Sequence, residues 1–313
     1  MINGQSPAYI AGKRGAPYAD HRYPHLVHLL RGTGGGRPDR LPSRQSHLIA
    51  SLAEHHARHR AWPLPGARSH RHGALRQTHI GYRYGDHIAY LDAWFDALDL
   101  DGVVLVGHDW GGALAFDWAS RHAERVRGIT FMETILRPMS WEDLPGGGKA
   151  RYELLRGAGT GEAKVLDENF FIEQALRATV LKGLSDFDWD VYRAPYPDRN
   201  SRRPLLEWPR AMPINGEPAD VVARIEAYDR WLSASPEVPK LLLTFEGPSE
   251  TLLIGNEVIS WCRDNVAGLE IRGCGPARHI APEDQPEAIA AEIKSWIDRR
   301  GLRAGHRKVA SQA

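Results

Sequence analysis

The sequence has few cysteines, almost no net charge and no long apolar run. Two cysteines in 313 residues, Cys262 and Cys274, are too few for a disulfide framework, which favours a reducing cytoplasm. The 40 basic and 39 acidic side chains leave a net charge of +1, so neither nucleic acid nor a membrane surface is an expected partner. No apolar stretch reaches the roughly 18–20 residues of a membrane span, and the N-terminus lacks a signal-peptide pattern. We expect a cytoplasmic globular protein, either a monomer or a weak homo-oligomer.

Residues 21–78 are short of acidic and β-branched apolar side chains. This segment holds ten arginines and nine of the 15 histidines, but only Asp39 and Glu54 as acids. Val27 and Ile49 are its only β-branched apolar residues, and no helical or strand periodicity persists for long. From Ile80 onward the chain has the patterning of an ordinary enzyme.

Beyond residue 80, short apolar runs alternate with amphipathic segments. The runs at 103–106, 129–132, 241–245 and 269–271 are typical of strands buried on both faces of a parallel sheet. The segments at 90–98, 113–126 and 286–300 have helical spacing. This alternation predicts an α/β fold with a doubly wound, mostly parallel sheet.

Strand patterns disappear between residues 137 and 218. Helix-like segments such as 167–181 occupy this part, punctuated by prolines. We therefore expect a helical cap at 137–218, inserted between core segments at 1–136 and 219–302, with a C-terminal tail at 303–313.

A tight strand-to-helix turn carries the most informative residue, Asp109. The turn Gly107-His108-Asp109-Trp110-Gly111-Gly112 has small residues on both sides of the central position, as a nucleophile elbow requires. A carboxylate there can displace a leaving group from saturated carbon and form an alkyl ester. The alternative is an ordinary aspartate in a strand-to-helix turn, for instance an N-cap.

The ester would need a base, an acid that orients the base, and a donor for the leaving anion. His279 follows the last strand, where a hydrolase base belongs, whereas His108 lies inside the elbow and His122 on the outgoing helix. Glu133 and Glu246 both end strands, and spacing does not choose between them as the orienting acid. The indole N–H of Trp110 is suited to an emerging halide, or the ring simply packs under the insertion.

These motifs resemble the haloalkane dehalogenases, although the elbow alone is shared with epoxide hydrolases. The companion motifs are Phe131-Met132-Glu133, Glu168 to Glu173 (ENFFIE), Arg202-Arg203-Pro204 through Trp208-Pro209-Arg210, Pro213-Ile214, and His279 leading into Glu283-Asp284 and Pro286. Together they extend over about residues 80–300.

The resemblance implies an α/β-hydrolase fold with the cap inserted after the Glu133 strand. It implies Asp109 as nucleophile, His279 as base and Glu133 rather than Glu246 as triad acid. Trp110 becomes a halide donor, and Phe171 and Pro209 resemble pocket and tunnel residues. The implied substrates are a small halogenated hydrocarbon and water, and this chemistry requires no metal or organic cofactor.

Three alternatives stay open. An epoxide hydrolase would use the same Asp and His, with Tyr152, Tyr192 or Tyr196 protonating the opening oxygen. A luciferase family shares this scaffold and several of the motifs. The third is a catalytically inactive product, because the family's His-Gly-Asn-Pro-Thr-Ser-Ser motif, whose Asn is the second halide donor, is missing.

The missing motifs reappear in another reading frame. Residues 41–51 (LPSRQSHLIAS) have permitted codons that, read one nucleotide later, give Phe-Leu-His-Gly-Asn-Pro-Thr-Ser-Ser-His. Residues 68–78 (RSHRHGALRQT), shifted in the same way, give Asp-Leu-Ile-Gly-Thr-Ala-Leu-Ser-Asp-Lys-Pro. We therefore hypothesise that residues from after 20 to 78 are a frameshifted translation, and expect the chain to lose two or more central strands. The histidines at 55, 56 and 59 are then an accident of that frame rather than a metal site.

Overall fold

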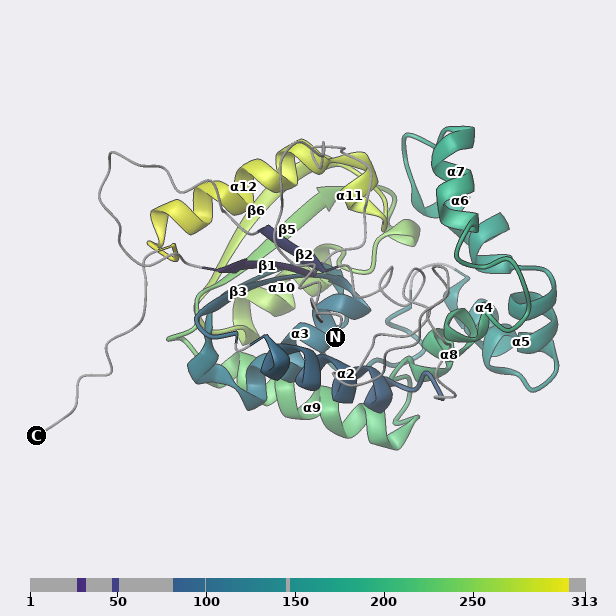
Figure 1. Cartoon of the computed structure of the whole chain (residues 1–313), viewed down its shortest axis with the longest axis horizontal. Coiled ribbons are helices and arrows are strands. Elements are labelled where there is room, and N and C mark those ends of the chain that lie inside the picture. The colour runs from purple at the N-terminus through teal and green to yellow at the C-terminus, as the bar shows by residue number, and fades with distance from the viewer. Residues whose placement is uncertain (1–26, 32–46, 51–80, 99, 145–146, 304–313) are drawn as a thin grey trace, which may run out of the picture.

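A six-stranded sheet runs through the centre of the computed structural model, in the order β2-β1-β3-β4-β5-β6 (Figure 1). The structure describes residues 27–31, 47–50, 81–98, 100–144 and 147–303. The strands are β1 (Val27–Arg31), β2 (His47–Ala50), β3 (Val103–Asp109), β4 (Val126–Thr134), β5 (Lys240–Glu246) and β6 (Leu269–Pro276). Strands β3 to β6 are parallel to one another, as the sequence predicts.

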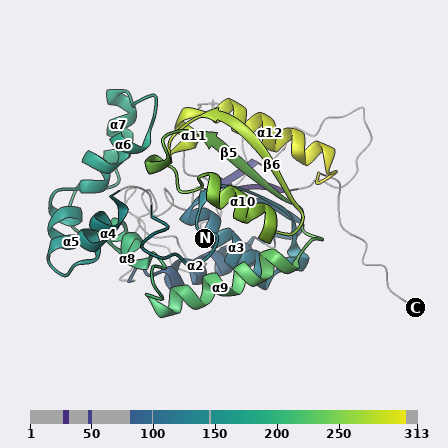
Figure 2. The same cartoon turned by 180° about the vertical axis from the view of Figure 1, so that it is seen from behind.

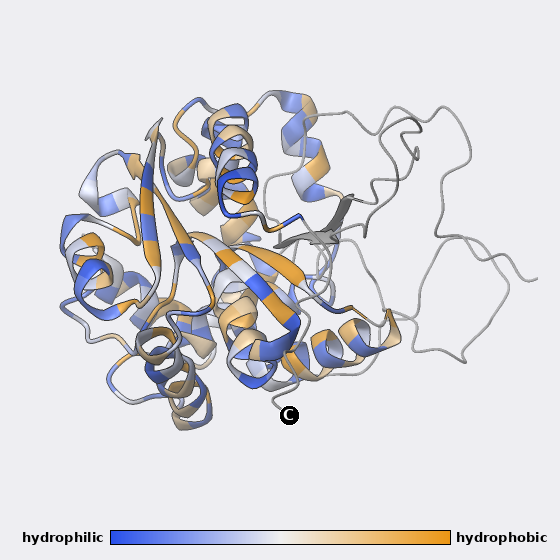
Figure 3. Ribbon diagram, turned by 90° about the vertical axis from the view of Figure 1, so that its left-hand side faces the viewer, coloured by the Kyte–Doolittle hydropathy of each residue, from blue (hydrophilic) through white to orange (hydrophobic). Residues whose placement is uncertain are grey.

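Alternate residues of the parallel strands enter two different cores. In β3, Val103 and Leu105 belong to one apolar cluster, whereas Val104 and Val106 belong to the other. All four are at most 1% exposed, which explains why this strand reads as an unbroken apolar run. Figure 3 shows apolar stretches on the strands, while the surrounding helices carry both polar and apolar residues.

Helices cover both faces of the sheet (Figures 1 and 2). One face packs against α2 (Tyr84–Ala97), α3 (Trp110–Arg121), α9 (Ala219–Ala234) and α10 (Asn256–Asn265). The other packs against α11 (Ala281–Asp284) and α12 (Pro286–Arg299). Short 3-10 turns at Ala123–Arg125 and Ser249–Thr251 lead into β4 and towards α10. This layered arrangement is the doubly wound α/β fold.

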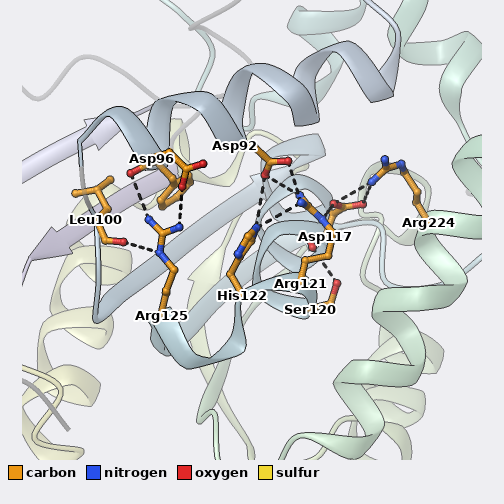
Figure 4. A network of polar contacts seen from close by, with 10 residues as sticks. Asp92, Asp96, Leu100, Asp117, Ser120, Arg121, His122, Arg125 and Arg224 are labelled. Carbon is orange, nitrogen blue, oxygen red and sulfur yellow. Dashed lines mark hydrogen bonds and ion pairs between the residues drawn. The ribbon is translucent and has the colours of Figure 1, made fainter. Parts of the chain in front are cut away.

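A buried carboxylate ties the helix after the elbow to its two neighbours (Figure 4). Asp117 on α3 is 3% exposed and accepts hydrogen bonds from Arg121 Nε at 2.9 Å and Arg224 Nη1 at 3.1 Å. The Arg121 guanidinium also donates two 2.8 Å hydrogen bonds to Asp92 of α2. Because these contacts join α3 to α2 and α9, they hold the helix that begins at the elbow in place.

A group of short helices between β4 and α9 lies to one side of the sheet (Figure 1). They are α4 (Gly148–Arg156), α5 (Thr160–Glu162), α6 (Leu176–Thr179), α7 (Asp186–Arg193) and α8 (Arg203–Ala211). The helical pattern at 167–181 does not form one helix. It folds as π-helical turns at Ala163–Asp167 and Phe171–Ala175 and then α6, because Asn169 has a left-handed φ of 53° that interrupts a helix.

Residues 21–78, in which we expect two or more central strands to be lost, supply the two strands β1 and β2. β1 pairs with β3 in the antiparallel direction, and β2 pairs with β1, also antiparallel. An extended backbone can satisfy the open hydrogen-bonding edge of β3 whatever its side chains, and the loss of two or more central strands stays a prediction. The rest of residues 21–78, the reading-frame hypothesis and the histidines at 55, 56 and 59 lie outside the described residues. Among the helices that the structure describes, none is long and apolar enough to cross a membrane.

Candidate active site

Asp109 stands at the point where β3 ends and α3 begins. Its backbone has φ 51° and ψ −134°, a conformation that non-glycine residues rarely adopt and that is often found at functional sites. The turn is tight enough to require glycine: a Cβ on Gly107 would lie 2.5 Å from Gly112 Cα, and one on Gly112 would lie 2.2 Å from Thr134 Oγ1. The Thr134 hydroxyl donates to the Asp109 carbonyl at 2.6 Å, which joins the turn to the end of β4.

Glu133 is the next-to-last residue of the neighbouring strand β4 and is buried, with 1% of its surface exposed. It also has a positive φ, 43°, which turns its side chain out of the regular strand. Its carboxylate accepts hydrogen bonds from the backbone N–H groups of Leu253 at 2.7 Å and Ile254 at 3.0 Å. These two donors stabilise a negative charge that would otherwise be costly in the interior.

His279 lies in the loop after β6, between these two carboxylates. Its Nδ1 is 3.1 Å from Glu133 Oε2, and its Nε2 is 3.8 Å from Asp109 Oδ1. Burial by itself lowers the pKa of His279, but Asp109 and Glu133 outweigh burial and raise the pKa to about 10. The imidazole is therefore held as a cation while both carboxylates are charged.

The other candidates from the sequence do not line the cavity described below. Glu246 is exposed at the end of β5, and His122 lies beside Asp92 at the end of α3. His108 is buried, and its Nε2 donates a 2.7 Å hydrogen bond to the carbonyl of His279. Burial, and then the nearby His279, lower the pKa of His108 to about 4, so it holds the loop as a neutral donor.

A cavity of about 540 Å³ opens above Asp109, Trp110 and His279. Trp110 is 5% exposed and stacks on Trp208 with ring centroids 4.8 Å apart. The remaining lining is mostly apolar, and Phe171 and Pro209 are both part of it. The site residues that the sequence singled out are thus brought to a single cavity, apart from Glu133, which lies behind His279.

The three tyrosines considered for epoxide opening also line this cavity: Tyr152, Tyr192 and Tyr196. Burial, together with the charge of Asp109, raises the pKa of Tyr152 to about 12, so its hydroxyl stays protonated. The Tyr192 hydroxyl donates to Glu283 Oε1 at 2.8 Å.

Sequence reasoning missed the groups that hold the site together. The Leu253 and Ile254 amides act through the backbone, so their residue types give no signal. His108 was considered only as a base, and the sequence did not indicate that its ring donates to the His279 carbonyl. Trp208 was part of a recognised motif, but nothing in its spacing indicated a stack on Trp110. Within the described parts of the chain, no cluster of three or more His, Cys, Asp or Glu side chains could hold a metal ion.

Comparison with known proteins gives a consistent result. The family described as alpha/beta hydrolase fold matches residues 39–219. A haloalkane dehalogenase of Mesorhizobium japonicum is 44% identical over 231 residues, which cover 72% of each chain. One from Sphingobium indicum is 44% identical over 220 residues, covering 70% of this chain and 72% of the relative.

The chain is also similar to solved structures of haloalkane dehalogenases. The crystal structure of the haloalkane dehalogenase DatA from Agrobacterium tumefaciens superposes with a TM-score of 0.67 at 38% identity, covering 72% of this chain and 76% of that one. That of DbeA from Bradyrhizobium elkanii superposes with a TM-score of 0.68 at 37% identity, covering 72% and 77%.

Proposed function

The chain belongs to the haloalkane dehalogenase family of α/β-hydrolases, and we propose that it hydrolyses small haloalkanes to alcohol and halide through an ester on Asp109. The observation that carries this proposal is the position of His279, with one ring nitrogen towards Asp109 and the other bonded to Glu133. In this proposal the nucleophile and the base face one apolar cavity, and the acid that orients the base lies behind it.

In the first step, a carboxylate oxygen of Asp109 attacks the carbon that bears the halogen. A carbon–oxygen bond forms as the carbon–halogen bond breaks, and the halide leaves with the bonding electrons. The Trp110 indole N–H is the proposed donor to the departing anion. The stack on Trp208 restrains the Trp110 ring, so this donor is oriented before the reaction.

The ester itself turns His279 into a base. Its pKa of about 10 depends in part on the negative charge of Asp109, and alkylation removes that charge. The pKa of His279 then falls, the imidazole releases its proton, and it can take a proton from water. The water oxygen attacks the ester carbonyl carbon, the alcohol leaves, and the Asp109 carboxylate is regenerated. The backbone N–H of Trp110 is the proposed donor to the intermediate oxyanion.

The test is bromide release from 1-bromobutane by the chain as written. We expect release that the Asp109→Ala variant lowers by about 10⁴-fold or more, since the substitution removes the attacking carboxylate. Asp96→Ala is the matched control, because the Asp96 side chain is 68% exposed and pairs with Arg125 away from the cavity. Equal release by the wild type and Asp109→Ala would contradict the proposal.

The epoxide alternative is less well supported, because the relatives named above are dehalogenases and the Tyr192 hydroxyl already donates to Glu283. An aliphatic epoxide of similar size in the same assay is the comparison, and we expect bromide release to be the faster reaction.

The remaining parts of the proposal concern the whole chain. We propose a cap at 137–218 inserted into a core at 1–136 and 219–302, a monomer or weak homo-oligomer, and a cytoplasmic location, which the two free, buried cysteines favour. Light scattering on the purified protein tests the oligomeric state, and cell fractionation tests the location.

We also propose that residues 21–78 are frameshifted. An intact frame in several independent reads of the gene would refute it, whereas a repaired frame that raises bromide release would support it.

A further inference from the structure

The loop that carries His279 is fastened on both sides of the histidine to one segment of the cap helices, residues 178–182. The N–H of Ile280 donates to the Thr179 carbonyl at 2.9 Å. The Arg278 guanidinium donates to the Ala178 carbonyl at 3.1 Å. Ala178 and Thr179 also line the cavity, so the segment that bounds the substrate space is the one bonded to the loop.

Asp284 adds further hydrogen bonds between this cap segment and the loop. It lies at the end of α11 and is 0% exposed. The N–H of Leu181 is 2.9 Å from both carboxylate oxygens, and the N–H of Lys182 is 2.9 Å from Oδ1. The N–H of Arg278, the residue before His279, donates to Oδ2 at 3.0 Å. Oδ1 of this buried carboxylate therefore accepts hydrogen bonds from the cap segment. Oδ2 accepts hydrogen bonds from both the cap segment and the loop that carries His279.

We propose that Asp284 is a positioning residue that couples the cap to the catalytic base, so that His279 is correctly placed only while residues 178–182 are seated against the loop. Asp284 is not among the residues that line the cavity and acts through the backbone of Arg278. This inference rests on the proposed function, since it assigns Asp284 a part in the hydrolysis of the Asp109 ester.

The inference predicts which of the two chemical steps depends on Asp284. The attack of Asp109 on the substrate does not use His279 as a base, whereas hydrolysis of the ester does. A shift of the loop that moves His279 away from Asp109 and Glu133 therefore slows the second step and leaves the first largely intact. A general loss of folded protein would instead lower both steps equally.

The variant that tests this is Asp284→Asn, which keeps the side-chain size but places an NH₂ donor against one of the backbone N–H groups. With 1-bromobutane we expect kcat to fall about 10- to 100-fold while kcat/KM changes by less than about threefold. Rapid quenching and intact-mass analysis should show the butyl ester accumulating relative to the wild type. Asp96→Asn is the matched control and should change neither constant. A parallel fall in kcat and kcat/KM without ester, or no change, would overturn the inference.

A second measurement does not require turnover. Titration of the His279 ring by NMR should give a pKa of about 10 in the wild type. In Asp284→Asn we expect the pKa to fall towards the ordinary histidine value, because the imidazole moves away from the two carboxylates that raise it. An unchanged titration would overturn the role of Asp284 even if the wild type released no bromide, a result that would contradict only the proposed function.

If Asp284→Asn does not melt cooperatively, both measurements are made on Asp284→Glu, which keeps the charge but displaces the carboxylate. The same directions are expected there with smaller changes, and an unchanged kcat together with an unchanged titration would again overturn the inference.

Discussion

The Nδ1 atom of His279 lies 3.1 Å from Oε2 of Glu133, a residue 146 positions earlier in the chain. The same carboxylate also accepts hydrogen bonds from two backbone N–H groups, so its position does not depend on the histidine alone. We predict that Glu133→Gln lowers kcat by about 10²–10⁴-fold, since the amide keeps the shape but loses the charge that favours a cationic imidazole. Steady-state bromide release is the measurement.

Glu246→Gln is the matched control for this variant. Glu246 is the exposed carboxylate that also ends a strand, and the same substitution there should leave kcat within about twofold of the wild type. The reverse ranking of the two variants would show that the triad acid has been assigned to the wrong strand.

The pKa of His279 predicts how stability depends on pH. A folded-state pKa of about 10 lies above the 6.5 of an unperturbed histidine, so protonation of His279 stabilises the folded state. This contribution is fully present below about pH 6.5 and is lost as the pH rises towards 10. Urea unfolding of the wild type should show a decline on the order of a few kcal/mol over that range.

His279→Gln removes the titrating group and should flatten this decline. Equal pH dependence in the wild type and His279→Gln would show that the imidazole is not held as a cation.

The elbow tolerates no side chain at Gly112, where a Cβ would lie 2.2 Å from Thr134 Oγ1 and 2.6 Å from Thr134 Cβ. We predict that Gly112→Ala lowers the free energy of unfolding by about 1–3 kcal/mol or more, because the end of β4 must move. Urea unfolding measures this change.

Gly85→Ala, in the first turn of α2, is the control, and we expect it to change the free energy of unfolding in the opposite direction. Nothing lies within 4 Å of a Cβ there, so alanine should stabilise the protein by about 0.4–1 kcal/mol. If Gly112→Ala were as stable as Gly85→Ala, the turn would be looser than the structure describes.

Trp110→Phe keeps an aromatic ring against Trp208 but removes the indole N–H. A lost hydrogen bond to a charged group costs about 1.5–3 kcal/mol, so we predict a fall of about 10- to 150-fold in kcat/KM. Trp261→Phe, on α10 and outside the cavity lining, should change kcat/KM by less than about twofold. An effect of Trp110→Phe no larger than that of Trp261→Phe would remove Trp110 from the halide site.

The sequence predicted the parts of the fold whose signal is local. The apolar run at 103–106, the glycines around Asp109 and the last helix each determine a structure from neighbouring residues, and all three occur as expected. The family resemblance then chose Glu133, which spacing alone did not separate from Glu246.

The remaining features depend on contacts between distant segments. The Leu253 and Ile254 amides that hold Glu133, and the link between Asp284 and the Leu181 N–H, involve backbone groups that every residue carries. The break at Asn169 depends on a left-handed backbone that a helical apolar pattern does not reveal. The antiparallel pairing of β1 with β3 follows from an open sheet edge rather than from any pattern in residues 27–31.

The central claim is that Asp109 becomes alkylated, and trapping that ester tests it most directly. His279→Gln should be incubated with 1-bromobutane and then examined by intact-mass analysis and peptide mapping. We predict that one butyl group accumulates on the peptide containing Asp109 and that one bromide is released per ester formed, because the attacking carboxylate remains while the base for hydrolysis is gone. Bromide release by the wild type, with no adduct or with an adduct on another residue in His279→Gln, would contradict the account.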